Sequence, residues 1–119
     1  MKTQLHTLET VAAKGRLLGL DMVYQCASGP LGGSFSAMDI LTVLYFETMR
    51  VDPARPDDPD RDRFVLSKGH CTPALYPILA QRGFFPEEDL KLFRSVDGHL
   101  SGHAEMHHVR GVDMSTGSL

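Results

Sequence analysis

The chain lacks the features of several large protein classes. Its 119 residues contain no apolar run near the roughly 18 residues that cross a membrane. The opening MKTQLHTLET has a single lysine and no apolar region of the kind that secretory signals carry. There are only 2 cysteines, Cys26 and Cys71, and their separation fits no disulfide framework. We therefore expect a cytoplasmic protein with free thiols and no membrane partner.

An excess of basic side chains is also missing. The 12 Lys and Arg stand against 15 Asp and Glu, which gives a formal net charge of −3. Nucleic acids and anionic membranes bind concentrated basic surfaces, so neither is an expected partner. The 42% hydrophobic and 23% charged content is typical of a soluble globular protein. The length predicts a single domain over residues 1–119.

The apolar spacing predicts two helices in the first part of the chain. Residues 7–27 repeat apolar or small side chains at intervals of three and four, the pattern of an amphipathic helix. The following ASGPLGGS, residues 27–34, is rich in glycine and predicts a break. A second helix is expected from Ser36, whose hydroxyl would cap it, with Asp39 at the reciprocal position of a capping box. The buried stripe expected on this helix consists of Ile40, Leu41, Leu44 and Met49.

A connector and a strand are expected next. VDPARPDDPDRDR, residues 51–63, combines prolines with charges of both signs and predicts a solvated connector. RFVLS, residues 63–67, is short and apolar and predicts a buried strand. A lone strand leaves its backbone donors and acceptors unpaired. The expected fold is therefore α/β, mostly helical in this chain, with one short strand that joins a sheet completed elsewhere.

Further helices are predicted in the second half. Thr72 and Pro73 mark a helix start and Gly83 its end. Pro77 favours a later start, because a proline inside a helix kinks it. Pro86 opens another helix, and the acidic side chains after it suit the positive end of the helix dipole. From residue 95 to residue 119 the pattern predicts a loop.

Two groups of residues are candidates for chemistry. FVLSKGH ends at His70 and places backbone N–H groups between a strand and a helix start, where anions such as phosphate bind. GHLSGHAEMHH, residues 98–108, holds four of the 6 histidines. His99, His103 and His107 recur every four residues, so a helix could present them to zinc, although two glycines disfavour that helix. Solvated loop histidines, and histidines that act on a substrate or an anionic cofactor, are the alternatives.

Several stretches, in order, resemble the beginning of a transketolase. They are ASGPLGGSFSAMDILTVLYF, DPDRDRFVLSKGHCTPALYPILAQRGFFPEEDL, GHLSGHAE and GVDMSTGSL. The resemblance covers essentially residues 10–119, and RDRFVLSKGH and STGSL are its specific elements. It implies the doubly wound α/β domain that binds thiamine diphosphate. It also implies an enzyme that transfers a two-carbon ketol unit between sugar phosphates.

The resemblance assigns roles to four residues. His70 of SKGH is expected near the diphosphate of the cofactor, and His103 of GHAE near the thiazolium, where it hydrogen-bonds a hydroxyl of the donor sugar. Gly117 and Leu119 of STGSL are expected to contact the rings of the cofactor. These roles displace the zinc interpretation. The histidines without a counterpart in the resemblance are His99, His107 and His108.

Two departures from the family pattern matter. The family commonly has a histidine that contacts the donor substrate at the position of Pro30, so another residue, another substrate or a low activity is implied. The sequence also ends at Leu119, before the motif that ligates Mg²⁺ and before the pyrimidine-binding domain with its activating glutamate. No metal ligand is therefore expected in this chain, and the Mg²⁺ ligands are expected on a partner chain.

Three hypotheses follow. The first is an N-terminal component of a transketolase-like enzyme, natural or truncated, that is inactive alone and active with partner chains supplying the metal-binding and pyrimidine domains. The second is a non-catalytic interaction or regulatory module derived from this fold. The third is a small zinc protein. Within the enzyme class, a related thiamine-dependent ketol or acyl transferase of a specialised pathway is the alternative to a sugar-phosphate enzyme.

Overall fold

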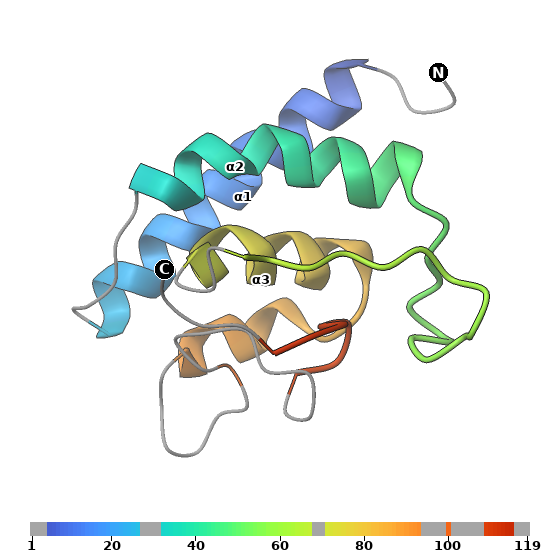
Figure 1. Ribbon diagram of the computed structural model, residues 1–119. Helices are drawn as coiled ribbons and strands as arrows, with labels where there is room; N and C mark the ends of the chain where they lie inside the picture. The colour runs from blue at the N-terminus through green and yellow to red at the C-terminus, as the bar shows by residue number, and fades with distance from the viewer. Residues whose placement is uncertain (1–4, 27–31, 68–70, 94–99, 101–108, 116–119) are drawn as a thin grey trace.

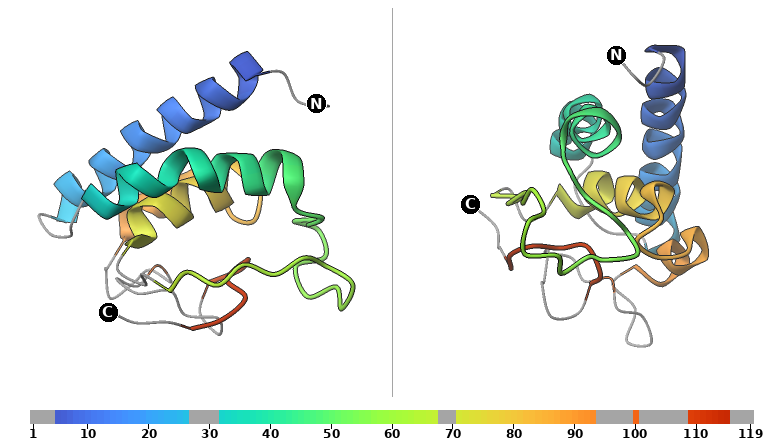
Figure 2. Two further views of the ribbon diagram at one scale, coloured as in Figure 1. Left: turned by 45° about the horizontal axis from the view of Figure 1, so that its top comes forward. Right: turned by 90° about the vertical axis from the view of Figure 1, so that its right-hand side faces the viewer.

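The described part of the chain is a helical layer with irregular segments on one side. The computed structural model describes residues 5–26, 32–67, 71–93, 100 and 109–115. Its elements are, in order, α1 (Leu5–Cys26), α2 (Gly32–Val43), η1 (Leu44–Thr48), α3 (Thr72–Arg82) and η3 (Glu87–Leu92). α3 lies between the α1–α2 pair and the irregular segments 50–67 and 109–115 (Figures 1 and 2). No helix within these residues is both long and apolar enough to cross a membrane.

α1 confirms the helix predicted over residues 7–27. It packs against both other helices through two glycines. A Cβ atom on Gly15 would lie 2.7 Å from the sulfur of Met38 in α2, and one on Gly19 would overlap the carbonyl oxygen of Pro73 in α3. The glycines therefore allow close approach of the helices, which compensates for their low helix propensity.

The start predicted for the second helix is wrong. α2 begins at Gly32, within the stretch expected to break the helix, and Ser36 lies inside it. Asp39 does not act in a capping box, because Ser36 is not the N-cap, and the Asp39 carboxylate pairs with Arg16 of α1 at 3.1 Å. Arg16 also donates to the carbonyl of Phe35 at 3.2 Å. Contacts with α1 therefore support the first turns of α2.

The buried stripe of this helix is also only partly as predicted. Leu41 is 1% exposed, but Ile40 is 64% exposed. Neighbouring residues of a helix lie about 100° apart around its axis, so Ile40 points away from the face that Leu41 buries. The residues fully or almost fully buried along this face are Ser34, Met38, Leu41, Thr42 and Tyr45. The chain continues into η1, a π-helical turn in which the Met49 amide donates to the Leu44 carbonyl at 2.7 Å.

α3 is the central helix of the core. It begins at Thr72, so the later start favoured by Pro77 is wrong, and Pro77 lies inside the helix. Every residue of α3 from 72 to 80 is buried. That burial outweighs the roughly 3 kcal/mol that an interior proline costs a helix. Gly83 ends the helix as predicted, with φ 107° and with its amide and that of Phe84 donating back to the last turn.

The predicted strand at residues 63–67 is not formed in the described part of the chain. Strand hydrogen bonds need a partner, and none of the described segments pairs with this one. The alternation of a strand is nevertheless present, because Phe64 and Leu66 pack on the core while Val65 is 46% exposed. The observed architecture is thus mostly helical, and completion of a sheet by other residues remains a prediction.

The helix predicted after Pro86 is shorter and tighter than expected. η3 is a 3-10 helix, and Pro86 precedes it with an extended backbone. The predicted loop at the end of the chain agrees with the described residues 109–115, which form turns. Cys71 is a buried free thiol, as expected.

Candidate functional site

The residues assigned to the site from the sequence lie outside the described part of the chain. His70, His103, Gly117 and Leu119 belong to segments 68–70, 101–108 and 116–119, and Pro30 belongs to segment 27–31. The histidines without a counterpart in the family pattern also lie outside the described part; they are His99, His107 and His108. The structure therefore describes the surroundings of the predicted site: the helix ends and the anchored chain that lead into these segments.

The first turn of α3 directly follows His70 and suits an anionic ligand. The residue at its N-cap, Cys71, makes no side-chain hydrogen bond to the helix. The first N–H groups of a helix point outward and carry a partial positive charge, which attracts phosphate groups. The prediction of a helix N-terminus after SKGH is confirmed.

The first turn of α2 carries a buried hydroxyl without a partner. Ser34 is 0% exposed, and its Oγ makes no hydrogen bond. An unsatisfied buried hydroxyl is costly, so such a group is commonly found where a ligand or a water completes it. The glycine-rich pattern predicted a break between helices here, and no local signal pointed to Ser34.

These two helix starts lie at the same end of the molecule. The first turns of α2 and α3 and the last turn of α1 are found together at one end of the helical layer (Figures 1 and 2). The chain from residue 60 to Ser67 runs toward this end as well (Figure 1). The last turn of α1 and the end of segment 60–67 thus lie in the same region as the two helix starts.

A partly buried ion pair joins two segments that lead toward the predicted site. Arg61 Nε donates to Asp113 Oδ1 at 3.0 Å, and the side chains are only 15% and 9% exposed. The other carboxylate oxygen of Asp113 accepts from the Phe64 amide at 2.8 Å. Arg61 also donates to the carbonyl of Asp58 at 2.9 Å. The prediction of a solvated connector over residues 51–63 is therefore wrong for Arg61.

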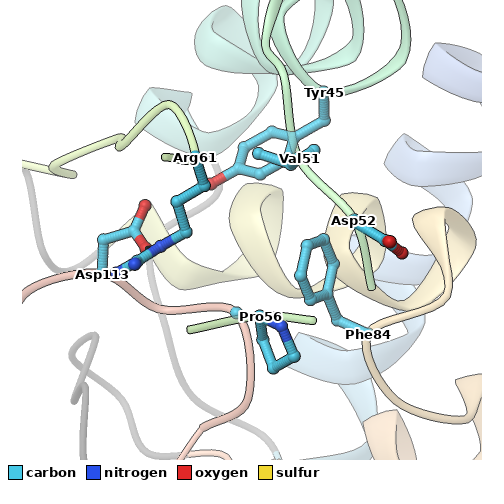
Figure 3. A pocket seen from close by; sticks show the side chains of 8 residues that line it. Tyr45, Val51, Asp52, Pro56, Arg61, Phe84 and Asp113 are labelled. Carbon is cyan, nitrogen blue, oxygen red and sulfur yellow. Dashed lines mark hydrogen bonds and ion pairs between the residues drawn. The ribbon is translucent and has the colours of Figure 1, made fainter. Parts of the chain in front are cut away.

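This ion pair borders a small cavity, which Figure 3 shows from close by. The cavity holds about 10 Å³, which is room for a single water and not for a substrate. Its lining residues are Tyr45, Val51, Asp52, Pro56, Arg61, Phe84, Gly111 and Asp113. Burial and the nearby Asp113 carboxylate raise the pKa of Tyr45, so its phenol stays protonated. The cavity is structural and is not a binding site for a cofactor.

No metal site occurs among the described residues. Within residues 5–26, 32–67, 71–93, 100 and 109–115, no three His, Cys, Asp or Glu side chains come together as ligands. The histidines of the zinc hypothesis lie outside these ranges.

Comparison with known proteins decides the family. The family model described as "Transketolase, thiamine diphosphate binding domain" matches residues 7–119. The chain belongs to the transketolase family. The resemblance of RDRFVLSKGH and STGSL to this family is thereby confirmed.

Several transketolases are similar to the chain over nearly its whole length. An apulose-4-phosphate transketolase subunit of Phocaeicola vulgatus is 41% identical over 98% of the chain and 41% of its own length. The 6-deoxy-6-sulfo-D-fructose transketolase subunit SqwG of Clostridium sp. (strain MSTE9) is 43% identical over 100% of the chain and 43% of its own length. The chain therefore spans about two fifths of these relatives.

Solved transketolases share the fold. The transketolase of Leishmania mexicana superposes with a TM-score of 0.86 and is 37% identical, over 94% of this chain and 17% of that one. The transketolase of Campylobacter jejuni gives a TM-score of 0.86 and 34% identity, over 97% of this chain and 18% of that one. The helical arrangement described above is thus that of the N-terminal part of a transketolase.

The start of α3 has the chemistry that suits the anionic end of thiamine diphosphate. The N–H groups at the α3 N-terminus can donate to phosphate oxygens, whereas the Ser34 hydroxyl is fully buried. Ligands for a Mg²⁺ ion on that diphosphate are lacking among the described residues. The start of α3 thus offers donors that suit an anion, and a metal beside it would need ligands from other residues.

Proposed function

We propose that this chain supplies part of the thiamine diphosphate site of a multi-chain transketolase, which moves a two-carbon ketol unit between phosphorylated sugars. The observation that carries the proposal is the match of the thiamine diphosphate-binding domain over residues 7–119. Two relatives named as transketolase subunits, 41% and 43% identical to the chain, support a multi-chain enzyme. Partner chains with the metal-binding and pyrimidine domains would complete it, and the isolated chain would be inactive.

We assign the residues as follows. The α3 N-terminus, together with His70, holds the diphosphate by N–H donation to its oxygens. Gly117 and Leu119 contact the rings of the cofactor, and His103 hydrogen-bonds a hydroxyl of the donor sugar. Bound thiamine diphosphate supplies the carbanion chemistry that breaks and forms the carbon–carbon bond. Mg²⁺ on the diphosphate takes its ligands from a partner chain.

The substrate is the open part of the proposal. Pro30 stands where the family commonly has a donor-contacting histidine, and one similar relative is named for a sulfo-sugar and another for apulose 4-phosphate. A sugar phosphate is the default donor, and a related thiamine-dependent ketol transfer is the alternative. We also propose that this enzyme is cytoplasmic.

Calorimetric titration with thiamine diphosphate and Mg²⁺ tests the proposal. The titration is run on the chain alone and on the complex that co-purifies with it from its native source. We expect saturable binding by the complex and ketol transfer from a sugar phosphate, with no tight binding by the chain alone. Absence of binding in both samples would contradict the proposal and favour a non-catalytic module.

Variants of two neighbouring histidines sharpen the test. His103→Ala should lower the ketol-transfer rate of the complex by about 100-fold, the loss typical of a positioned polar group. His107→Ala is the matched control, since it has no role in the family pattern, and it should leave the rate unchanged. Equal effects of the two substitutions would overturn the role given to His103.

A further inference from the structure

We propose that Asp113, paired with Arg61, is a positioning residue for cofactor binding, because it joins two described stretches of this transketolase chain, residues 61–64 and 113, that each precede residues expected at the cofactor. The inference rests on the proposed function. It adds a role for two residues that neither the family motif nor the sequence pattern had assigned.

The contacts of Asp113 use both of its carboxylate oxygens on one segment. Oδ1 accepts from Arg61 Nε at 3.0 Å, and Oδ2 accepts from the Phe64 backbone amide at 2.8 Å. The second contact goes to the main chain, so it fixes the position of the backbone and not only of a side chain. Residues 61–64 and 113 are therefore held together although 49 positions separate Phe64 from Asp113.

The two segments continue directly into predicted site residues. Residues 61–64 lead through Ser67 to His70, and Asp113 leads through Ser115 to Gly117 and Leu119. A chain extends by at most about 3.6 Å per residue, so an anchor limits where the few residues beyond it can lie. Asp113 thus joins the described stretch that precedes the residue expected at the diphosphate to the described stretch that precedes the residues expected at the rings.

Neighbouring contacts keep the Arg61–Asp113 pair rigid. Arg61 has a second anchor on the carbonyl of Asp58, at 2.9 Å. On the other side, Gly111 has φ 99°, and a Cβ atom there would lie 2.9 Å from the ring of Phe84. A turn fitted this closely against an aromatic ring has little room to shift. Groups that orient a binding residue affect how tightly the ligand is held, so loss of rigidity here should weaken cofactor binding.

The position of the pair also distinguishes it from ordinary surface ion pairs. Lys14 and Glu87 form a salt bridge of the same length, 3.0 Å, but their side chains are 52% and 39% exposed. Exposed ion pairs of this kind contribute little to the stability of the fold. The Arg61–Asp113 pair is mostly shielded from water and carries a main-chain contact in addition, which is what positioning requires.

The test measures cofactor affinity and turnover of the assembled complex. Asp113→Asn keeps an oxygen for the Phe64 amide but removes the charge that holds Arg61. We expect the Kd for thiamine diphosphate, at saturating Mg²⁺, to rise by about 10-fold or more, as for other residues that orient a binding group. The kcat at saturating cofactor should change by less than about 3-fold, because Asp113 touches no reacting atom. Arg61→Lys should raise the Kd as well, since lysine lacks the planar fork that reaches both partners.

Two controls separate positioning from stability. Glu87→Gln removes the charge of the exposed ion pair and should leave the Kd unchanged. Leu8→Ala, at a residue that is 4% exposed near the opposite end of α1, should lower the melting temperature without raising the Kd. If Asp113→Asn fails to assemble, Arg61→Lys, which keeps both charges, supplies the measurement.

The Kd values of these variants decide between the positioning role and a purely structural one. A Kd rise with Asp113→Asn and Arg61→Lys, but with neither control, supports the positioning role. A Kd that stays at the wild-type value, or that rises equally with Leu8→Ala, overturns that role and leaves the proposed function intact. A wild-type complex that binds no thiamine diphosphate overturns the proposed function and this inference with it.

Discussion

Gly19 of α1 lies against the backbone carbonyl of Pro73 in α3, so closely that any Cβ atom at position 19 would overlap the oxygen. This carbonyl belongs to the first turn of α3, four residues before Pro77, whose missing N–H would have been its helical partner. The approach of α1 thus occurs where α3 has lost a hydrogen bond. It also fixes the helix start that we expect to hold the diphosphate.

Gly19→Ala should therefore destabilise the protein, although alanine is the better helix former. Overpacking of a tight contact typically costs about 1–3 kcal/mol, more than the roughly 1 kcal/mol gained in helix propensity. Urea unfolding measures the difference. Gly15→Ala is the control, because its new Cβ would meet the flexible end of Met38 and not the backbone. A smaller loss at Gly19 than at Gly15 would contradict this packing.

Two adjacent positions on α2 should respond very differently to truncation. Leu41→Ala should cost about 2–5 kcal/mol of unfolding free energy, because the side chain is 1% exposed and leaves a cavity. Ile40→Ala should stay within about 0.5 kcal/mol, because Ile40 is 64% exposed. Thermal or urea unfolding of the two variants checks the expectation, and similar losses would show that α2 is rotated about its axis.

Local sequence signals predicted the parts of the fold that depend on local chemistry. α1 follows from its apolar spacing, and the end of α3 follows from Gly83, which adopts the positive φ that favours glycine. Local sequence signals could not predict the start of α2. It depends on Arg16 of α1 reaching Phe35 and Asp39, a contact between distant segments that no local pattern signals.

The surroundings of the site depend on long-range contacts in the same way. Arg61 sits among charges that predict solvent exposure, but it is mostly buried where it pairs with Asp113, 52 positions away. Residues 63–67 keep the alternation of a strand, but a strand forms only with a partner strand, which the pattern of one segment cannot supply. The site residues themselves came from the family motif, and the structure tests the helix start beside His70 and not His70 itself.

Two glycines with positive φ should differ in their response to alanine. Gly83 has φ 107° with only Pro53 atoms at 3.6–3.7 Å from a new Cβ, whereas Gly111 has φ 99° with the ring of Phe84 at 2.9 Å. Both substitutions strain the backbone by about 1–2 kcal/mol. Gly111→Ala should cost about 1–3 kcal/mol more, because the ring must also move. Equal losses in urea unfolding would argue against the close packing of residues 109–115 on Phe84.

Alkaline pH should weaken the fold through Tyr45. Burial and the Asp113 carboxylate raise the pKa of Tyr45 in the folded protein. A tyrosine in the unfolded chain ionises near pH 10, so the unfolded state loses this proton first. The stabilisation is complete below about pH 10 and falls as the pH rises beyond it, by up to about 1.4 kcal/mol per pH unit for this one group.

Unfolding by urea between pH 9 and about pH 11 measures how steeply the unfolding free energy falls with pH. Tyr45→Phe should reduce that slope, while Tyr24→Phe, at a residue that is 79% exposed, serves as the control. An unchanged slope in Tyr45→Phe would show that the alkaline loss of stability arises from another group.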